Sequence, residues 1–221
     1  MTISMDEQVM WDAYTYAAFR ALVDAIIPPT CRQHAAGEVE YAAGAVQLHV
    51  DQFVRREIDH SQFVPAGEKE TPVPLSRSTA QLLNIGAEAL IRRGLARLPL
   101  PLRLSPETCL FAVLSRENRL QALELLDRVE ISLHRAPPPY QNNPAMIQTM
   151  VDTLNQLTMF GYYTEWLRHE TLRLSSPSSG LDASCPSVWR LIGYPGPAFG
   201  YRDFRGFIMA YPHGKGETPH D

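Results

Sequence analysis

Apolar residues recur at helical spacing through about the first 170 residues of this 221-residue chain, and this periodicity constrains the fold more than any other feature. Between Asp6 and Ile27 the apolar positions follow each other three or four residues apart until two prolines end the run. The same spacing is seen in four later segments: 45–58, 76–98, 105–134 and from 143 onward. The sequence therefore predicts an all-α domain of about five helices, orthogonal or bundle-like, over residues 1–172.

Two proline-containing stretches give the clearest helix starts. Ser-Pro-Glu at 105–107 combines a capping residue, a proline at the first helical position and an acid near the positive end of the helix. Asn143 and Pro144 open the last and most apolar helix. Gly161 lies inside that helix, where glycine costs about 1 kcal/mol relative to alanine, so we expect another segment to approach its backbone closely.

The last 48 residues have a different character. They contain six of the eighteen prolines and seven of the thirteen glycines, without sustained periodicity. Eleven of the twenty aromatic residues lie between Phe160 and Tyr211, whereas disordered tails are poor in aromatic residues. We therefore expect residues 173–221 to form an extended, irregular segment whose aromatic side chains attach it to a protein surface.

Within this segment, GYPGPAFGYRDF combines residues that suit binding to a partner. Prolines pre-set an extended backbone, glycines permit close approach, and aromatic side chains are the large, rigid anchors that dominate interfaces. The predicted partner-binding residues are Tyr162, Tyr163, Trp166, Trp189, Tyr194, Pro195, Gly196, Pro197, Phe199, Tyr201 and Phe204. An alternative is that the segment folds back over the chain's own helices and covers the aromatic residues at 162–166.

Composition and motifs argue against several kinds of site. A net charge of −4 and a pI near 6.0 give no basic footprint for nucleic acid. The sequence contains no dinucleotide-binding GxGxxG, no nucleotide phosphate loop and no GxSxG elbow. His169 and Glu170 begin like a zinc-protease helix, but Arg173 stands where the second histidine would be needed. We therefore predict no catalytic, cofactor-binding or metal-binding residues in this chain.

A few single residues leave alternatives open. His49 falls on the apolar face of a predicted helix, where a hydrogen-bonded core histidine is a more common role than a metal or proton-transfer site. Asp24 is flanked by apolar residues and suits a capping or packing role better than that of a buried acid with a raised pKa. Cys31, Cys109 and Cys185 are far apart, which favours three reduced thiols over a disulfide framework or a zinc site.

Targeting signals also inform the expected location. No apolar run approaches the roughly 20 residues that span a bilayer, and the first residues contain neither an apolar signal region nor a twin arginine. We therefore expect a cytoplasmic protein with no direct membrane span. A periplasmic location would require that a signal was removed or that a partner carries one.

Four segments, in this order, resemble the gluconate 2-dehydrogenase subunit 3 family: RALVDAIIPPT, AAGAVQLHVDQFV, TMFGYYTEW and GYPGPAFGY. Members of that family are helical small subunits without a redox centre, and they accompany a large FAD-dependent subunit of the glucose-methanol-choline type. The resemblance implies a non-catalytic, chaperone-like subunit of a hetero-oligomer that stabilises and helps mature a sugar or alcohol dehydrogenase or oxidase. FAD would then be bound by the partner. Escort through twin-arginine export, a role of many relatives, is not implied, because the twin arginine is missing.

Two other functions fit the residues by themselves. One is a stand-alone helical enzyme with a metal or ligand pocket between helices, in which His49 or His169 would bind the metal. The other is a helical binding or regulatory protein of a different type.

Overall fold

The computed structural model describes residues 5–33, 39–61, 74–96, 108–165 and 188. Its helices are α1 (Met5–Ile26), α2 (Val50–Ser61), α3 (Leu75–Arg92), α4 (Leu110–Val113), α5 (Arg116–Asp127) and α6 (Pro144–Tyr163), with the short 3-10 helix η1 (Leu133–Arg135). Two strands, β1 (Thr30–Gln33) and β2 (Val39–Ala42), complete the described elements. The predicted all-α class is confirmed.

The chain divides into two units, Met1–Val188 and Trp189–Asp221. The second unit, and with it most of the predicted extended segment, lies outside the described residues. The boundary predicted between residues 172 and 173 also falls outside them and stays a prediction.

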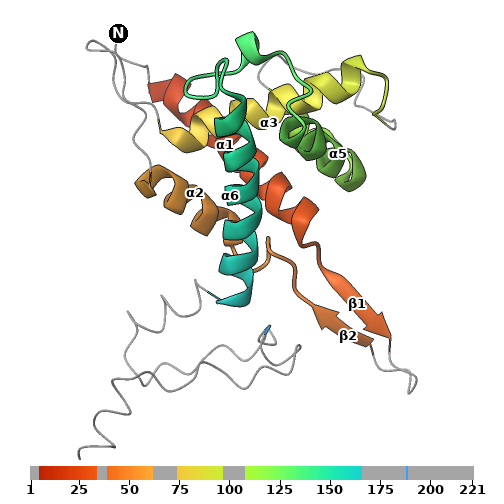
Figure 1. The fold of residues 1–221 in the computed structure, drawn as a ribbon. Helices are drawn as coiled ribbons and strands as arrows, with labels where there is room; N and C mark the ends of the chain where they lie inside the picture. Colours follow the sequence, from red (N-terminus) through yellow and green to blue (C-terminus); the bar gives the residue numbers. More distant parts are fainter. Residues whose placement is uncertain (1–4, 34–38, 62–73, 97–107, 166–187, 189–221) are drawn as a thin grey trace, which may run out of the picture. The chain divides into compact units, whose positions relative to one another are not determined.

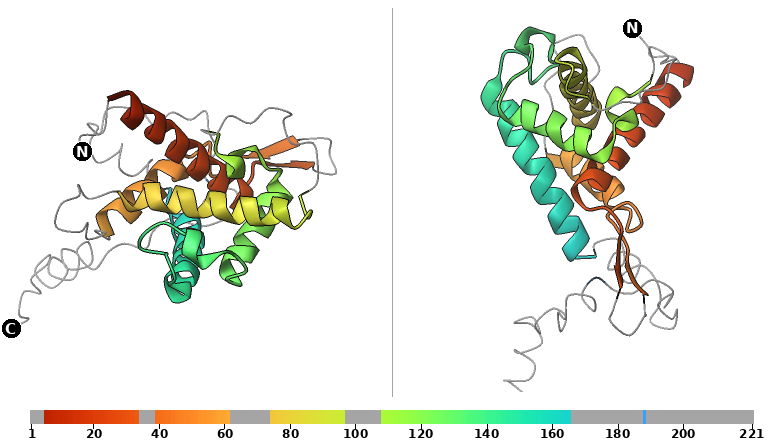
Figure 2. Two further views of the ribbon diagram at one scale, coloured as in Figure 1. Left: turned by 90° about the horizontal axis from the view of Figure 1, so that it is seen from above. Right: turned by 90° about the vertical axis from the view of Figure 1, so that its right-hand side faces the viewer.

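Helix α1 is the centre of the first unit, since it contacts each of the other helices from α2 to α6. The most extensive helix pairs are α3 with α5 and α2 with α6. In Figure 1 the axes of α3 and α6 run in very different directions, and Figure 2 shows the same crossing from two other sides. The core of this unit contains large side chains that are almost completely buried: Phe19, Leu22, Leu82, Leu83, Leu90, Phe111, Leu126, Tyr140, Ile147 and Leu154.

Side-chain caps explain two of the helix starts. The Asn143 side chain accepts a hydrogen bond from the Met146 N–H at 3.1 Å, and Pro144 follows it in the first turn of α6, as the sequence predicts. At α3, the cap comes from another helix, because the Asp59 carboxylate in α2 accepts from both the N–H and the hydroxyl of Ser76 at 2.8 Å. This pair of bonds ties the end of α2 to the beginning of α3.

The single helix predicted over 105–134 is wrong. The structure has α4, then a break at Leu114, then α5, and later η1. Leu114 and Ser115 adopt extended backbone angles, and the Ser115 hydroxyl accepts from the Asn118 N–H at 3.3 Å, so α5 begins with its own N-cap. The predicted start at 105–107 lies outside the described residues.

Helix α3 ends earlier than its apolar spacing predicts, at Arg92 instead of near residue 98. Gly94 has a φ of +67°, a conformation that favours glycine. Its N–H donates to the Ile91 carbonyl at 2.9 Å, and the Leu95 N–H donates to the Leu90 carbonyl at 3.2 Å. These two bonds form a Schellman motif, which stops the helix although the apolar spacing continues.

The loop predicted between the first two helices contains a short antiparallel hairpin. Strands β1 and β2 pair from Thr30 opposite Ala42 to Gln33 opposite Val39. At its base, Gly44 lies so close to Pro29 that an added Cβ would come within 2.4 Å of the proline nitrogen. Glycine is therefore required where the chain returns from the hairpin towards α2.

Candidate interaction surface

The C-terminal end of α6 packs tightly against α2. An added Cβ on Gly161 would lie 2.5 Å from Cδ1 of Phe53 and 3.1 Å from Cγ1 of Val50. A side chain at position 161 would therefore collide with the ring of Phe53 in α2, which is itself buried. The close approach predicted at Gly161 is confirmed, and its cause is Phe53.

Two aromatic side chains at the same end of α6 are about half exposed. Phe160 is 52% exposed, and its ring centroid lies 5.9 Å from that of Phe53, with the two rings tilted by 31°. Tyr163 is 47% exposed, and its ring meets that of Tyr162 edge to face at 5.2 Å. Phe160 and Tyr163, which we call the aromatic patch, thus place two large rings at the surface.

Tyr162 has a different place from its neighbour. Its side chain is only 8% exposed, and its hydroxyl donates to the Ala43 carbonyl at 2.8 Å. The ring therefore belongs to the core and anchors α6 to the end of the hairpin. Tyr162 is therefore covered by the chain itself and Tyr163 is exposed, and the partner-binding role expected of both tyrosines stays a prediction.

The other predicted anchors lie outside the described residues: Trp166, Trp189, Tyr194, Pro195, Gly196, Pro197, Phe199, Tyr201 and Phe204. Val188, next to Trp189 in sequence, is described and is buried in the core, 2% exposed. The structure therefore brings Tyr163 and the buried Tyr162 together and leaves the remaining anchors as predictions.

Three of the four segments quoted for the family resemblance meet in the structure. Segment 42–54 is joined to 158–166 by the hydrogen bond of Tyr162 and by the contact of Phe53 with Gly161. It is joined to 20–30 by a hydrogen bond from the Ala45 N–H to the Ile27 carbonyl at 2.9 Å. Segments far apart in sequence therefore form one packed region beside the aromatic patch.

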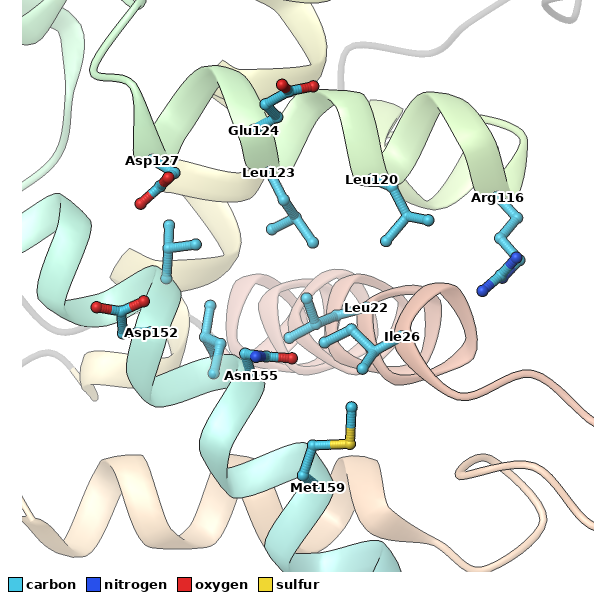
Figure 3. Close-up of a pocket in the computed structure, with 12 residues that line it drawn as sticks. Leu22, Ile26, Arg116, Leu120, Leu123, Glu124, Asp127, Asp152, Asn155 and Met159 are labelled. Carbon is cyan, nitrogen blue, oxygen red and sulfur yellow. The ribbon is translucent and has the colours of Figure 1, made fainter.

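An open groove of about 470 Å³ lies between α1, α5 and α6, with the side chains shown in Figure 3. Its floor includes Leu22 and Leu154, which are at most 1% exposed. Its sides carry apolar residues that are only partly covered, including Leu120 at 38% and Met159 at 39% exposed. We call it the α1–α5–α6 groove, and it is lined by Leu22, Ile26, Arg116, Leu120, Leu123, Glu124, Asp127, Val151, Asp152, Leu154, Asn155 and Met159.

The two ends of this groove differ in charge. Figure 3 shows Arg116 at one end and the carboxylates of Asp127 and Asp152 at the other. Arg116 donates through Nε to the Ala25 carbonyl at 2.9 Å. Glu124 lies between Arg116 and Asp127 along α5, its carboxylate points away from the groove in Figure 3, and it is paired with Arg128 at 2.6 Å. Among the described residues, neither Asp127 nor Asp152 has a hydrogen-bond or ion-pair partner for its carboxylate.

Asp24 is partly exposed and forms an ion pair between helices, a role that the sequence did not suggest. Its carboxylate pairs with Arg119 at 2.9 Å, and the same guanidinium donates to the Ala112 carbonyl at 2.9 Å. The Arg119 side chain is only 15% exposed. The guanidinium of Arg119 in α5 is therefore largely buried and links this helix to α1 and α4.

His49 does not have the position expected from the apolar spacing. It precedes α2, has a φ of +54° and is exposed, so neither a core histidine nor a site on an apolar helix face is found there. The buried polar residue in this region is Asp51, which is 3% exposed. Burial raises the pKa of its carboxyl above the usual range. Sequence reasoning missed Asp51, although its position between Val50 and Phe53 is a signal for partial burial.

The partly buried Tyr14 of α1 meets the buried Cys109 at the start of α4. The Tyr14 hydroxyl and the Cys109 thiol share a hydrogen bond, and burial raises the pKa of both groups. Both are therefore neutral at physiological pH, which makes Cys109 a poor nucleophile. Cys31 and Cys109 are free thiols, as predicted, and Cys185 lies outside the described residues.

The described part of the chain has neither a metal-binding cluster nor a membrane-spanning helix. Those residues contain no group of three or more His, Cys, Asp or Glu side chains placed to hold a metal ion. Within the same ranges, every helix is too short or too polar to cross a bilayer. His169 lies outside them.

Comparisons of the chain with protein-family models, curated proteins and solved structures found no match.

Proposed function

We propose that this chain is a non-catalytic small subunit that stabilises and helps mature a large FAD-dependent oxidoreductase of the glucose-methanol-choline type. The partner would be a sugar or alcohol dehydrogenase or oxidase, and FAD would be bound by the partner. The proposal starts from the resemblance of four segments to the gluconate 2-dehydrogenase subunit 3 family.

The observation that supports it most is the meeting of three of those segments at one place. Tyr162 and Phe53 join the described residues of segment 158–166 to segment 42–54, and the hydrogen bond from the Ala45 N–H to the Ile27 carbonyl joins 42–54 to 20–30, although more than 100 residues separate the first segment from the last. The aromatic patch lies on the third of them. Large aromatic side chains in an otherwise packed region are typical centres of protein interfaces.

Stabilisation of the partner would follow from binding alone. A subunit that binds only the folded large chain stabilises it by about 2.7 kcal/mol when its free concentration is 100 times the Kd. The aromatic patch would provide part of the contact area, and the predicted anchors from Trp189 to Phe204 would provide the rest. Prolines in that segment would lower the entropic cost of ordering it.

Co-expression tests the proposal directly. A neighbouring gene whose product has an N-terminal GxGxxG would be expressed alone, with this chain, and with this chain shortened after residue 188. We expect soluble, flavin-loaded enzyme only with the full chain. If the flavoprotein is equally soluble, flavin-loaded and active alone, the proposal is wrong.

Point variants separate the aromatic patch from general effects on folding. We expect Phe160→Ala with Tyr163→Ala to reduce the yield of the complex, while Tyr16→Ala, a change at an exposed aromatic residue of α1, leaves it unchanged. Thermal unfolding of each variant alone provides the control for stability. Turnover of a substrate by the purified chain itself would contradict the proposal and favour a stand-alone helical enzyme.

A further inference from the structure

We propose that the α1–α5–α6 groove binds an amphipathic helix of another protein, with apolar side chains in the groove and basic side chains beside Asp127 and Asp152. The inference does not depend on whether that protein is a flavoprotein. It follows from the shape of the groove, its partly covered apolar residues and the distribution of charge along it.

The shape of the groove matches a helix of about three turns. Five residues of α5 line it: Arg116, Leu120, Leu123, Glu124 and Asp127. Their spacing places them on one face and extends from the first residue of α5 to the last. At a rise of about 1.5 Å per residue, this face is roughly 16 Å long.

The apolar residues of the groove are only partly covered by the chain itself. Leu120 of α5 and Met159 of α6 are both more than a third exposed, and Leu123, Val151 and Ile26 are half-buried. They stand above a floor that is fully packed. The apolar lining comes from three helices, and charged residues of α5 and α6 flank it. A groove of this kind can bind the apolar face of an amphipathic helix.

The charges select the kind of helix. Asp127 is the last residue of α5, so its carboxylate adds to the negative end of that helix dipole, and Asp152 faces the same end of the groove. Because both carboxylates are unpaired within the described residues, a lysine or arginine placed there would find two partners. Arg116 marks the opposite end, where an acidic or neutral residue would fit.

The same charges disfavour two other occupants. A second copy of this chain would bring together two linings that each carry three carboxylates and one guanidinium. An anionic membrane surface would meet the same carboxylates. A basic amphipathic helix is the occupant that complements both the apolar residues and the acidic end.

Two peptide probes test the inference with the full-length chain. Both would be capped, 18 residues long and have leucines at positions i, i+3, i+4 and i+7. One would carry lysines at one end of the polar face, and the other would carry glutamates there. Fluorescence anisotropy would give the affinities, and methyl NMR of Leu120, Leu123 and Val151 would locate the site.

We expect the lysine peptide to bind about three- to tenfold more tightly than the glutamate peptide, as two exposed ion pairs would give. Asp127→Asn with Asp152→Asn should abolish that preference, whereas Asp12→Asn, a change outside the groove, should preserve it. Leu120→Gln should weaken both peptides. Because Leu120 is 38% exposed, this variant is expected to fold, which circular dichroism would verify.

Several results would overturn the inference. These are equal affinity for the two peptides, absence of binding by both, a preference that persists in the double Asn variant, or methyl shifts confined to residues outside the groove. Methyl shifts that change on dilution without peptide would indicate a second copy of the chain in the groove and would also contradict it. None of these results bears on co-expression with the flavoprotein, so the two proposals fail separately.

Discussion

The two sides of helix α6 have similar residues and very different surroundings. On one side, Gly161 and Tyr162 are covered by α2 and by the end of the hairpin. On the other side, Met159 and Tyr163 remain 39% and 47% exposed. Tyr162 and Tyr163 show the contrast most directly, since adjacent tyrosines are 8% and 47% exposed. Residue type alone therefore does not distinguish core from candidate interface here.

The largest difference in stability should be seen between variants of Phe53, the buried α2 residue that packs against Gly161, and variants of Phe160, which is half-exposed on α6. Phe53→Ala should lower the free energy of unfolding by about 3–5 kcal/mol, because it leaves a cavity in the buried contact between α2 and α6. Phe160→Ala should cost less than about 1 kcal/mol, because half of that ring is in solvent. Denaturant unfolding of both variants measures the two changes in the free energy of unfolding. Equal decreases would show that the two rings are equally well packed.

Gly161→Ala tests how closely the helices approach each other. The new methyl group would meet the Phe53 ring, and overpacking of this kind costs about 1–3 kcal/mol, partly offset by the higher helix propensity of alanine. We expect a net loss of up to about 2 kcal/mol in the free energy of unfolding, measured by thermal or denaturant unfolding. Gln156→Ala, at an exposed position of α6, is the matched control and should change stability by less than about 0.5 kcal/mol. A stabilised Gly161→Ala protein would contradict the close packing.

A smaller effect is expected from the hydroxyl of Tyr162. Tyr162→Phe removes the donor to the Ala43 carbonyl and leaves that buried acceptor without its bond, at a cost of about 1 kcal/mol. Tyr41→Phe, at a 47% exposed tyrosine of β2, should be neutral. Chemical denaturation of the two variants compares them, and an unchanged midpoint for Tyr162→Phe would mean that the bond contributes nothing to stability.

The smallest effect concerns the carboxyl of Asp51, and the size of this effect on stability depends on pH. Because burial raises the pKa of this carboxyl in the folded state, the folded protein holds the proton more tightly than the unfolded chain. The free energy of unfolding therefore decreases as the pH rises from the unfolded pKa, near 4, through the folded value. Asp51→Asn should be more stable than the parent at neutral pH, and the difference should shrink towards pH 4. Unfolding midpoints across this range measure it, and a pH-independent difference would contradict the burial of the charged form.

Much of the helical structure could be predicted because its signals are local. The apolar spacing of α1 and the Asn143 cap of α6 depend only on residues a few positions apart, and Gly161 is recognisable in the sequence as a residue that disfavours a helix interior. Local signals also existed where the predictions were wrong. Gly94 ends α3, and Ser115 caps the start of α5. The prediction missed both signals because the apolar spacing continues past them.

The sequence by itself determined that this chain is helical, where most helices lie, and that α6 must meet another element at Gly161. Only the tertiary structure decided which tyrosine is covered, where the groove lies and which carboxylates surround it. The reason is the range of the interactions. Helix signals act over a few residues, whereas the Ala43 carbonyl that receives the Tyr162 hydroxyl is 119 residues away along the chain. Burial is set by such distant segments, and periodicity within one helix contains no information about them.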